Sequence, residues 1–178
     1  MTMTPPLRKF ALTVHITSSV SWIGAVMAYL GLVIAALTSQ DAQVVRALWT
    51  AMKVTAWYVL TPMALASLLT GLIMSLGTKW GLFRPYWVLI SFLLTIIATI
   101  VLLTQLETIS VMADTAAGTD AADSRRGLWS QLLHAGGGLL VLLVIQVLNI
   151  YKPRGMTPYG WRKQQEQRLS RQTADATI

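Results

Sequence analysis

Two histidines, His15 and His134, are the residues whose chemistry could hold a cofactor or a metal ion. Each lies inside a long apolar run, where an ionisable side chain is a candidate functional residue by default. A neutral imidazole can ligate haem iron, copper or zinc, and it can equally hydrogen-bond a neighbouring hydroxyl. Both histidines are therefore candidate haem or metal ligands, with interhelical hydrogen bonding as the alternative.

Gly138 follows His134 by one helical turn, and Gly137 is almost as close. The missing side chains would leave room for a flat macrocycle such as haem b, and they would equally admit a neighbouring backbone. Gly138 is thus a candidate cofactor-binding residue or a site of close helix packing.

Other kinds of chemistry find no support in the residue inventory. The chain has no cysteine, which excludes thiolate metal sites and cysteine nucleophiles. The apolar runs contain no Asp, Glu, Lys or Arg, which excludes a proton relay built on carboxylates. No catalytic triad or phosphate-binding loop is present. The sequence assigns no catalytic residue and favours a non-enzymatic role.

The elements that must position the histidines are membrane-spanning helices. Hydrophobic residues make up 54% of the chain and charged residues only 12%, whereas soluble domains carry about 25% charged residues. Four uncharged runs, each long enough to cross a hydrocarbon core of about 30 Å, predict spans at about 10–37, 54–76, 86–106 and 128–151. We therefore predict an all-α, polytopic four-helix membrane bundle over residues 1–155.

Smaller signals refine this outline. Ser39 and Asp41 can cap a helix that begins at Ala42 and continues into the second span. Pro62 lies within that span and predicts a kink, because it removes one backbone donor. Residues 156–178 form a basic tail that we predict to be solvated and mostly disordered.

The distribution of Lys and Arg predicts the orientation. Ten of them lie in the leader (residues 1–9), in the middle connection (77–87) and in the segment that follows the fourth span (152–178), and four lie in the other two connections. Because cytoplasmic segments are enriched in Lys and Arg, both termini should be cytoplasmic in a bacterial plasma (inner) membrane. The net charge of +7 then indicates contact with anionic lipid headgroups and not with nucleic acid.

Each predicted span carries a stripe of polar or small residues at helical spacing, which indicates a common interior stabilised by close packing and interhelical hydrogen bonds. The stripes are His15, Ser18, Ser19, Trp22 and Tyr29; Met63, Ser67, Gly71 and Ser75; Ser91, Thr95 and Thr99; and Gln131, His134, Gly138 and Leu142.

The two histidines should lie at different depths. Counted from the middle of each run, His15 is near the cytoplasmic side and His134 is displaced outward, about 20 Å apart along the membrane normal. The two axial ligands of one haem lie only about 4 Å apart. One protomer therefore cannot hold one haem between them, and two sites or ligands shared across a homodimer remain as alternatives.

Several segments carry a family resemblance: LTVHITSSVSWIGAVMAYLGLVIAAL, GTKWGLFRPYWVL, LLHAGGGLLVLL and YKPRGMTPYG. They resemble a family of bacterial four-helix integral membrane proteins of unknown function, with the GLFR and YKPRG boxes as the more specific parts. His15, Trp22 and Gly24 are also similar to a pattern in copper-resistance D-type proteins and in the J-type membrane protoporphyrinogen oxidase, a haem-linked enzyme.

The resemblance implies that relatives carry further histidines, where this chain has Pro85 and Gln105. Two bis-histidine haems would need those partners, and this chain lacks both.

Three functions stay open. The first is an accessory or scaffold protein that packs into a homodimer or a larger membrane complex. The second is a b-type haem-binding electron-transfer module that uses His15, His134 or both. The third is a metal or small-solute carrier, with Pro62 and the hydroxyl stripes lining a path.

Overall fold

The computed structural model describes residues 3–77, 82–116, 121–153 and 155–175. Its elements are α1 (Pro5–Thr38), α2 (Ala42–Thr55), the π-helix η1 (Ala56–Leu60), α3 (Thr61–Gly77), α4 (Tyr86–Thr115), α5 (Ala121–Tyr151) and α6 (Pro158–Asp175). Four stretches are long and apolar enough to cross a membrane: Pro5–Thr38, Ala42–Gly77, Tyr86–Thr115 and Ser124–Tyr151. The predicted all-α membrane fold is confirmed.

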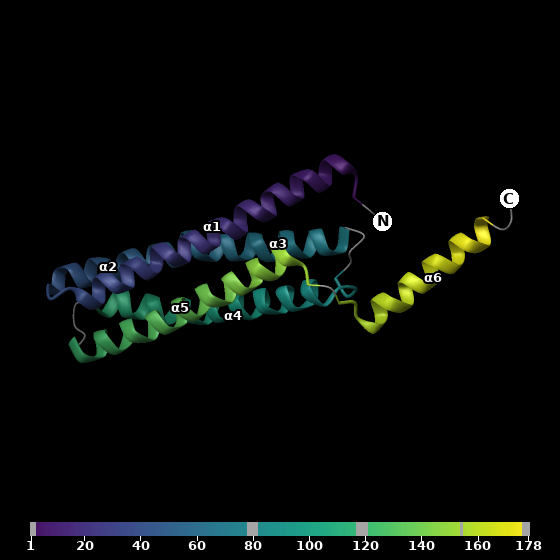
Figure 1. Cartoon of the computed structure of the whole chain (residues 1–178). Coiled ribbons are helices and arrows are strands. Elements are labelled where there is room, and N and C mark those ends of the chain that lie inside the picture. Colours follow the sequence, from purple (N-terminus) through teal and green to yellow (C-terminus); the bar gives the residue numbers. More distant parts are fainter. Residues whose placement is uncertain (1–2, 78–81, 117–120, 154, 176–178) are drawn as a thin grey trace.

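The spans form an elongated bundle of antiparallel helices (Figure 1). Helix α1 packs against α2, α3 and α5, and α4 packs against the same three elements. Both chain termini lie toward one end of the bundle, and the α1–α2 and α4–α5 connections lie at the other. We call these the terminal end and the distal end.

The start of the second span follows the predicted capping. The Asp41 side chain accepts a hydrogen bond from the Gln43 backbone N–H at 2.7 Å, and Ser39 Oγ accepts one from the Asp41 N–H at 3.2 Å. These contacts satisfy backbone donors that a helix start otherwise leaves unpaired. The helix then continues without a break from Ala42 to Gly77.

The distortion predicted at Pro62 takes the form of a π-turn in the five residues Ala56–Leu60, just before it. The Thr61 N–H reaches back to the Ala56 carbonyl, and the Thr61 hydroxyl donates to the same oxygen at 2.8 Å. A π-turn widens the helix by one residue, so the chain can pass a position where proline supplies no donor.

The two halves of the core differ in side-chain size. The distal half buries large residues, among them Trp22, Val26, Tyr29, Val33, Trp49, Met52, Leu106, Ile109 and Leu128. The terminal half buries Leu142 together with several smaller, hydroxyl-bearing residues, which are Ser18, Ser67, Ser75, Ser91 and Thr99. The helices can therefore approach closely in the terminal half, where hydroxyls replace bulky apolar groups.

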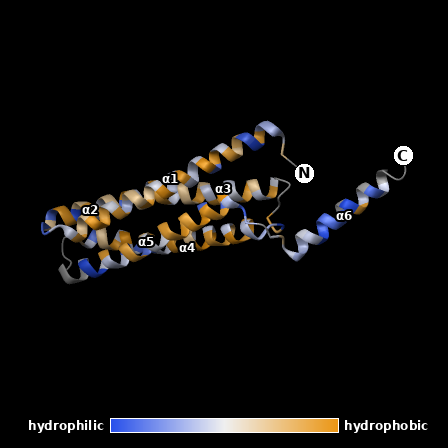
Figure 2. Cartoon of the chain, in the orientation of Figure 1, coloured by the Kyte–Doolittle hydropathy of each residue, from blue (hydrophilic) through white to orange (hydrophobic). Residues whose placement is uncertain are grey.

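The bundle is mostly hydrophobic along its middle, and hydrophilic residues gather toward its ends (Figure 2). On α4 the uncharged surface runs from Tyr86 to Leu106, which corresponds to about 31 Å and matches a hydrocarbon core. Charged side chains at Lys53, Glu107, Asp114 and Arg126 follow at the distal boundary, and we call them the distal ring.

The prediction of a disordered tail is wrong, because residues 158–175 form helix α6. Helix α6 extends away from the terminal end of the bundle (Figure 1). Its sequence is rich in Gln, Arg, Lys and Glu, which have high helix propensity, and Lys163 pairs with Glu166 at 3.3 Å. Polarity predicted solvation, but polarity alone does not prevent a helix.

The start of α6 is fixed to the connection between α3 and α4. The Thr157 hydroxyl donates to the Phe83 carbonyl, and the Thr157 N–H donates to the Arg84 carbonyl at 2.9 Å. The Thr157 oxygen also accepts from the Gly160 N–H at 3.1 Å and so caps α6. The GLFR box thus lies against the segment that directly follows the YKPRG box.

Candidate functional site

His15 is half-buried between α1 and α3. Its Nδ1 lies 3.0 Å from Thr70 Oγ1, and that hydroxyl donates to the Ala66 carbonyl at 2.6 Å. The Thr70 oxygen must then accept, which places the His15 proton on Nδ1. A Cβ added at Gly71 would lie 3.1 Å from His15 Cε1, so the ring packs directly against the α3 backbone.

Neighbouring hydroxyls extend this contact between α1 and α3. Ser19 Oγ lies 2.8 Å from Ser67 Oγ, and the Ser18 hydroxyl donates to the His15 carbonyl at 3.1 Å. His15 is therefore one member of a polar contact that joins two helices. The polar stripes predicted on these two spans face each other here.

The stripe on α4 behaves differently, because its hydroxyls bond within their own helix. Thr95 donates to the Ser91 carbonyl and Thr99 to the Thr95 carbonyl, each at 2.8 Å. Ser91 Oγ is the one buried side-chain polar atom without a partner in the part of the chain that the structure describes. Because these hydroxyls donate to carbonyls of their own helix, they form no hydrogen bond between α4 and a neighbouring helix.

A second polar contact crosses the core nearer the distal end. The Tyr29 hydroxyl donates to Gln131 Oε1 at 2.9 Å, and Gln131 Nε2 donates to Gln105 Oε1 at 3.3 Å. Tyr29 and Gln131 are buried, and these bonds link α1, α5 and α4. Sequence periodicity placed Tyr29 and Gln131 on interior faces, but it could not pair them.

His134 is exposed on α5, one turn from Gln131. Its Nδ1 lies 2.7 Å from the carbonyl oxygen of Ser130. A carbonyl can only accept, so Nδ1 carries the proton and Nε2 keeps a free lone pair. No described residue bonds that nitrogen.

The glycines beside His134 face open space. A Cβ added at Gly136, Gly137 or Gly138 would meet no other atom of the described chain within 4 Å. Neither a neighbouring helix nor a side chain of the described residues lies within 4 Å of these three added Cβ positions, whereas Ala135 and Leu139 beside them pack against the core. Gly137 and Gly138 follow His134 by three and four residues, so these three residues share one side of the helix and form an uncovered face, which we call the α5 face.

The structure keeps the two histidines apart. The Tyr29–Gln131 bond fixes the register of α1 against α5. His15 lies about 21 Å toward the terminal end from Tyr29, and His134 about 4.5 Å from Gln131 in the same direction. The separation along the bundle is thus about 16 Å, too large for two ligands of one haem. No three His, Cys, Asp or Glu side chains gather into a metal site anywhere in the described ranges.

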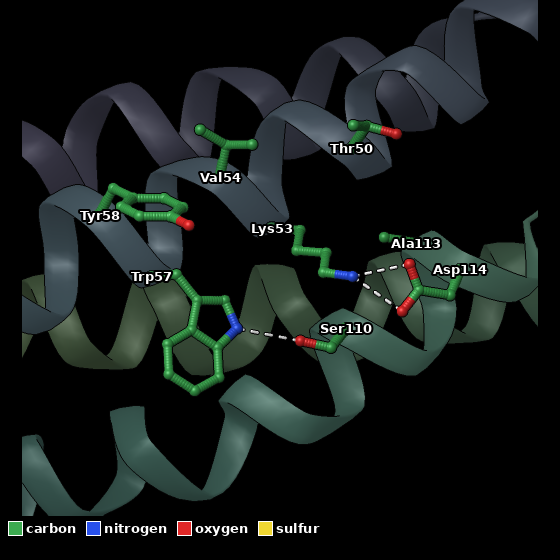
Figure 3. A pocket seen from close by; sticks show the side chains of 8 residues that line it. All are labelled: Thr50, Lys53, Val54, Trp57, Tyr58, Ser110, Ala113 and Asp114. Atoms are coloured by element: carbon green, nitrogen blue, oxygen red, sulfur yellow. Dashed lines mark hydrogen bonds and ion pairs between the residues drawn. The ribbon is translucent and has the colours of Figure 1, made fainter.

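A groove that sequence reasoning missed lies between α2, η1 and α4 at the distal ring (Figure 3). It is open to the outside, has a volume of about 540 Å³ and is lined by Thr50, Lys53, Val54, Trp57, Tyr58, Ser110, Ala113 and Asp114. Lys53 Nζ pairs with both Asp114 carboxylate oxygens, and the Trp57 indole N–H donates to Ser110 Oγ at 3.0 Å. The sequence signal that could have pointed to this groove was Pro62. The π-turn just before this proline contributes Trp57 and Tyr58 to the groove, and π-turns frequently lie at functional positions.

Comparisons with known proteins give one family. The family model described as "Predicted integral membrane protein (DUF2269)" matches residues 9–153, which include all of the last three membrane-spanning stretches and all but the first four residues of the first. No curated protein matches the chain, and no solved structure matches it.

Proposed function

The chain belongs to the DUF2269 family of predicted integral membrane proteins, and on that premise we propose that it is a non-catalytic accessory or scaffold component of a membrane complex. Its partner is a membrane-spanning helix that packs on the α5 face and offers an O–H or N–H donor to His134. The observation that carries this proposal is the free Nε2 lone pair of His134 on an exposed helix face.

The depth of His134 makes that lone pair costly. His134 lies about 12 Å inside the boundary marked by Arg126, within the hydrocarbon core. A polar atom without a hydrogen bond in hydrocarbon is unfavourable by several kcal/mol, because no water replaces the missing partner. A partner helix with a suitable donor removes this cost.

The glycines make close approach of such a helix feasible. Small residues let two helix backbones come together, which favours association where lipid offers no hydrophobic driving force. Helix α5 also has the most free surface: only 6% of its most apolar stretch is buried by the chain, against 28% for α1. These features support α5 as the docking helix.

For orientation we propose cytoplasmic termini in a bacterial plasma membrane. The support is the excess of Lys and Arg in the leader, the middle connection and the segment after the fourth span (152–178), ten residues against four. A reporter fused after Ile178 should be active only in the cytoplasm, and activity outside the cytoplasm would contradict this orientation.

Photo-cross-linking in native membranes tests the docking face. A benzophenone amino acid in place of Leu133, which is 73% exposed beside His134, should give one discrete protein adduct. The same group in place of Leu69, which is 58% exposed on α3, should react with lipid alone. Mass analysis of the adduct distinguishes a second copy from another protein, and lipid-only products at both positions would overturn the proposal.

The same lone pair favours one second candidate, a b-type haem or a metal ion held by His134. An Nδ1–H bonded to a backbone carbonyl is the usual arrangement of a ligating histidine, and Gly137 and Gly138 leave space beside it. Haem would supply one-electron transfer, with His134 as its ligand. His15 is less suited, because its ring packs on Gly71. An oxidised and reduced absorbance spectrum with elemental analysis tests this candidate.

A further inference from the structure

The groove at the distal ring presents a cation and an anion side by side. Lys53 Nζ lies 2.6 and 2.7 Å from the two Asp114 oxygens, and the two side chains are 31% and 65% exposed. An ammonium has three N–H donors and a carboxylate has about four acceptor positions. The pair can therefore bind a further anion at Lys53 and a further cation at Asp114 without separating.

Polarity changes in order along the groove toward the membrane. One turn, or about 6 Å, below Lys53 and Asp114 lie Trp57 and Ser110, joined by their hydrogen bond (Figure 3). Trp57 and Tyr58 are 48% and 77% exposed, and such aromatic side chains favour the headgroup boundary. The order is charge, then hydroxyl and indole, then apolar surface, which is the order of a phospholipid from headgroup to acyl chain.

From this arrangement we infer that the groove binds a zwitterionic aminophospholipid, with its phosphate at Lys53 and its primary ammonium at Asp114. The glycerol region lies near Trp57 and Ser110, and the acyl chains run down the outer surface of α3 and α4. The site is independent of the α5 face, so either can fail without the other.

The charges of the groove select this headgroup over its competitors. Lys53 and Asp114 sum to zero, so an anionic headgroup that satisfies Lys53 is repelled by Asp114. A primary ammonium donates N–H bonds to the Asp114 carboxylate, whereas the quaternary ammonium of choline has no N–H to donate.

Native mass spectrometry of the purified full chain tests the inference. The protein is equilibrated with phosphatidylethanolamine, phosphatidylcholine and phosphatidylglycerol of identical acyl chains. We expect phosphatidylethanolamine adducts to exceed each competitor by roughly tenfold, the effect of one charge-assisted hydrogen bond. Equal retention of the three lipids would overturn the inference.

Substitutions in the groove test whether the preference for phosphatidylethanolamine arises there. Lys53→Met and Asp114→Asn should each reduce phosphatidylethanolamine retention by roughly tenfold. Lys163→Met and Glu166→Gln are matched controls, because they make the same charge changes in an exposed pair on α6 and should leave retention unchanged. Undiminished retention in both groove variants would contradict the assignment.

Fluorescence quenching of the unaltered protein tests the site without relying on groove variants that could misfold. Phosphatidylethanolamine brominated high on its acyl chains, diluted into phosphatidylglycerol vesicles, should quench tryptophan fluorescence more than the choline lipid does. The difference should disappear in Trp57→Phe. Equal quenching by the two lipids would contradict a lipid site in this groove. Displacement of the lipid by millimolar soluble phosphoethanolamine would also contradict it, because the groove would then bind a soluble molecule and not a lipid.

Discussion

The Tyr29 hydroxyl donates a 2.9 Å hydrogen bond to the Gln131 side-chain oxygen across the core of the bundle. The bond joins the first and fourth spans, and Gln131 passes the connection on to Gln105 in the third. Both Tyr29 and Gln131 are buried, so neither can exchange its partner for water.

Tyr29→Phe should lower the free energy of unfolding by about 0.5–1.5 kcal/mol, because it removes the donor and leaves the Gln131 oxygen unpaired. Tyr58→Phe is the matched control, since Tyr58 is 77% exposed. Denaturant unfolding in detergent micelles measures both. Equal effects of the two variants would show that the buried bond contributes nothing specific.

Gly71→Leu should destabilise the chain by about 1–3 kcal/mol through overpacking. Its Cβ alone would come within 3.1 Å of the His15 ring, and a longer side chain must displace that ring from Thr70. Gly24→Leu should be neutral or slightly stabilising, because no atom lies within 4 Å of its Cβ position and Gly is a poor helix former. Thermal unfolding followed by circular dichroism compares them; a stable Gly71→Leu protein would refute the close His15 contact.

Gly138→Leu should leave the stability of the isolated chain unchanged while it blocks the partner helix in native membranes. The reason is that a Cβ at Gly138 meets open space within the chain but faces the proposed partner. Unfolding of the purified variant and the Leu133 cross-linking yield are the two measurements. Destabilisation of the isolated chain by more than about 1 kcal/mol would mean that this face is packed internally.

Gly160→Ala should loosen the start of α6. A Cβ at Gly160 would lie 2.7 Å from the Arg84 carbonyl oxygen, a backbone atom that cannot move aside freely. Gly155→Ala is the control, because its Cβ would make only an ordinary 3.6 Å contact with Tyr86. Hydrogen exchange of the first turn of α6 should rise in the first variant only. Unchanged exchange in Gly160→Ala would contradict the fixed junction.

The membrane spans were predictable from the sequence because an uncharged run of more than 20 residues fits few structures besides a membrane helix. Helical periodicity is local, so it placed Tyr29, Ser67 and Gln131 on interior faces. It could not pair Tyr29 with Gln131, since that choice depends on which helices become neighbours. The polarity of the tail predicts disorder, but its residues are also good helix formers, and the structure shows that this second property prevails.

For the candidate sites, too, the sequence predicts what is local to one helix and does not predict what depends on the packing of several helices. The sequence identified His134 and Gly138 as neighbours on one turn, but their exposure depends on how α5 packs against α1 and α4. The groove was not predicted because Lys53 and Asp114 lie on separate helices, each beside one end of a span. Only the packing of α2 against α4 brings these charges within 2.6 Å.

The distal ring has a consequence for the membrane voltage. The distal segments, including the connections, carry Arg46, Lys53, Arg125 and Arg126 against Asp41, Glu107, Asp114, Asp120 and Asp123, a sum of 4 − 5 = −1. In the proposed orientation these charges cross a bilayer whose interior side is electrically negative. Outward transfer of one net negative charge is favoured by about 2.3 kcal/mol per 100 mV. In that orientation the resting potential of the cell would help to insert the two helical hairpins and would then hold them in place.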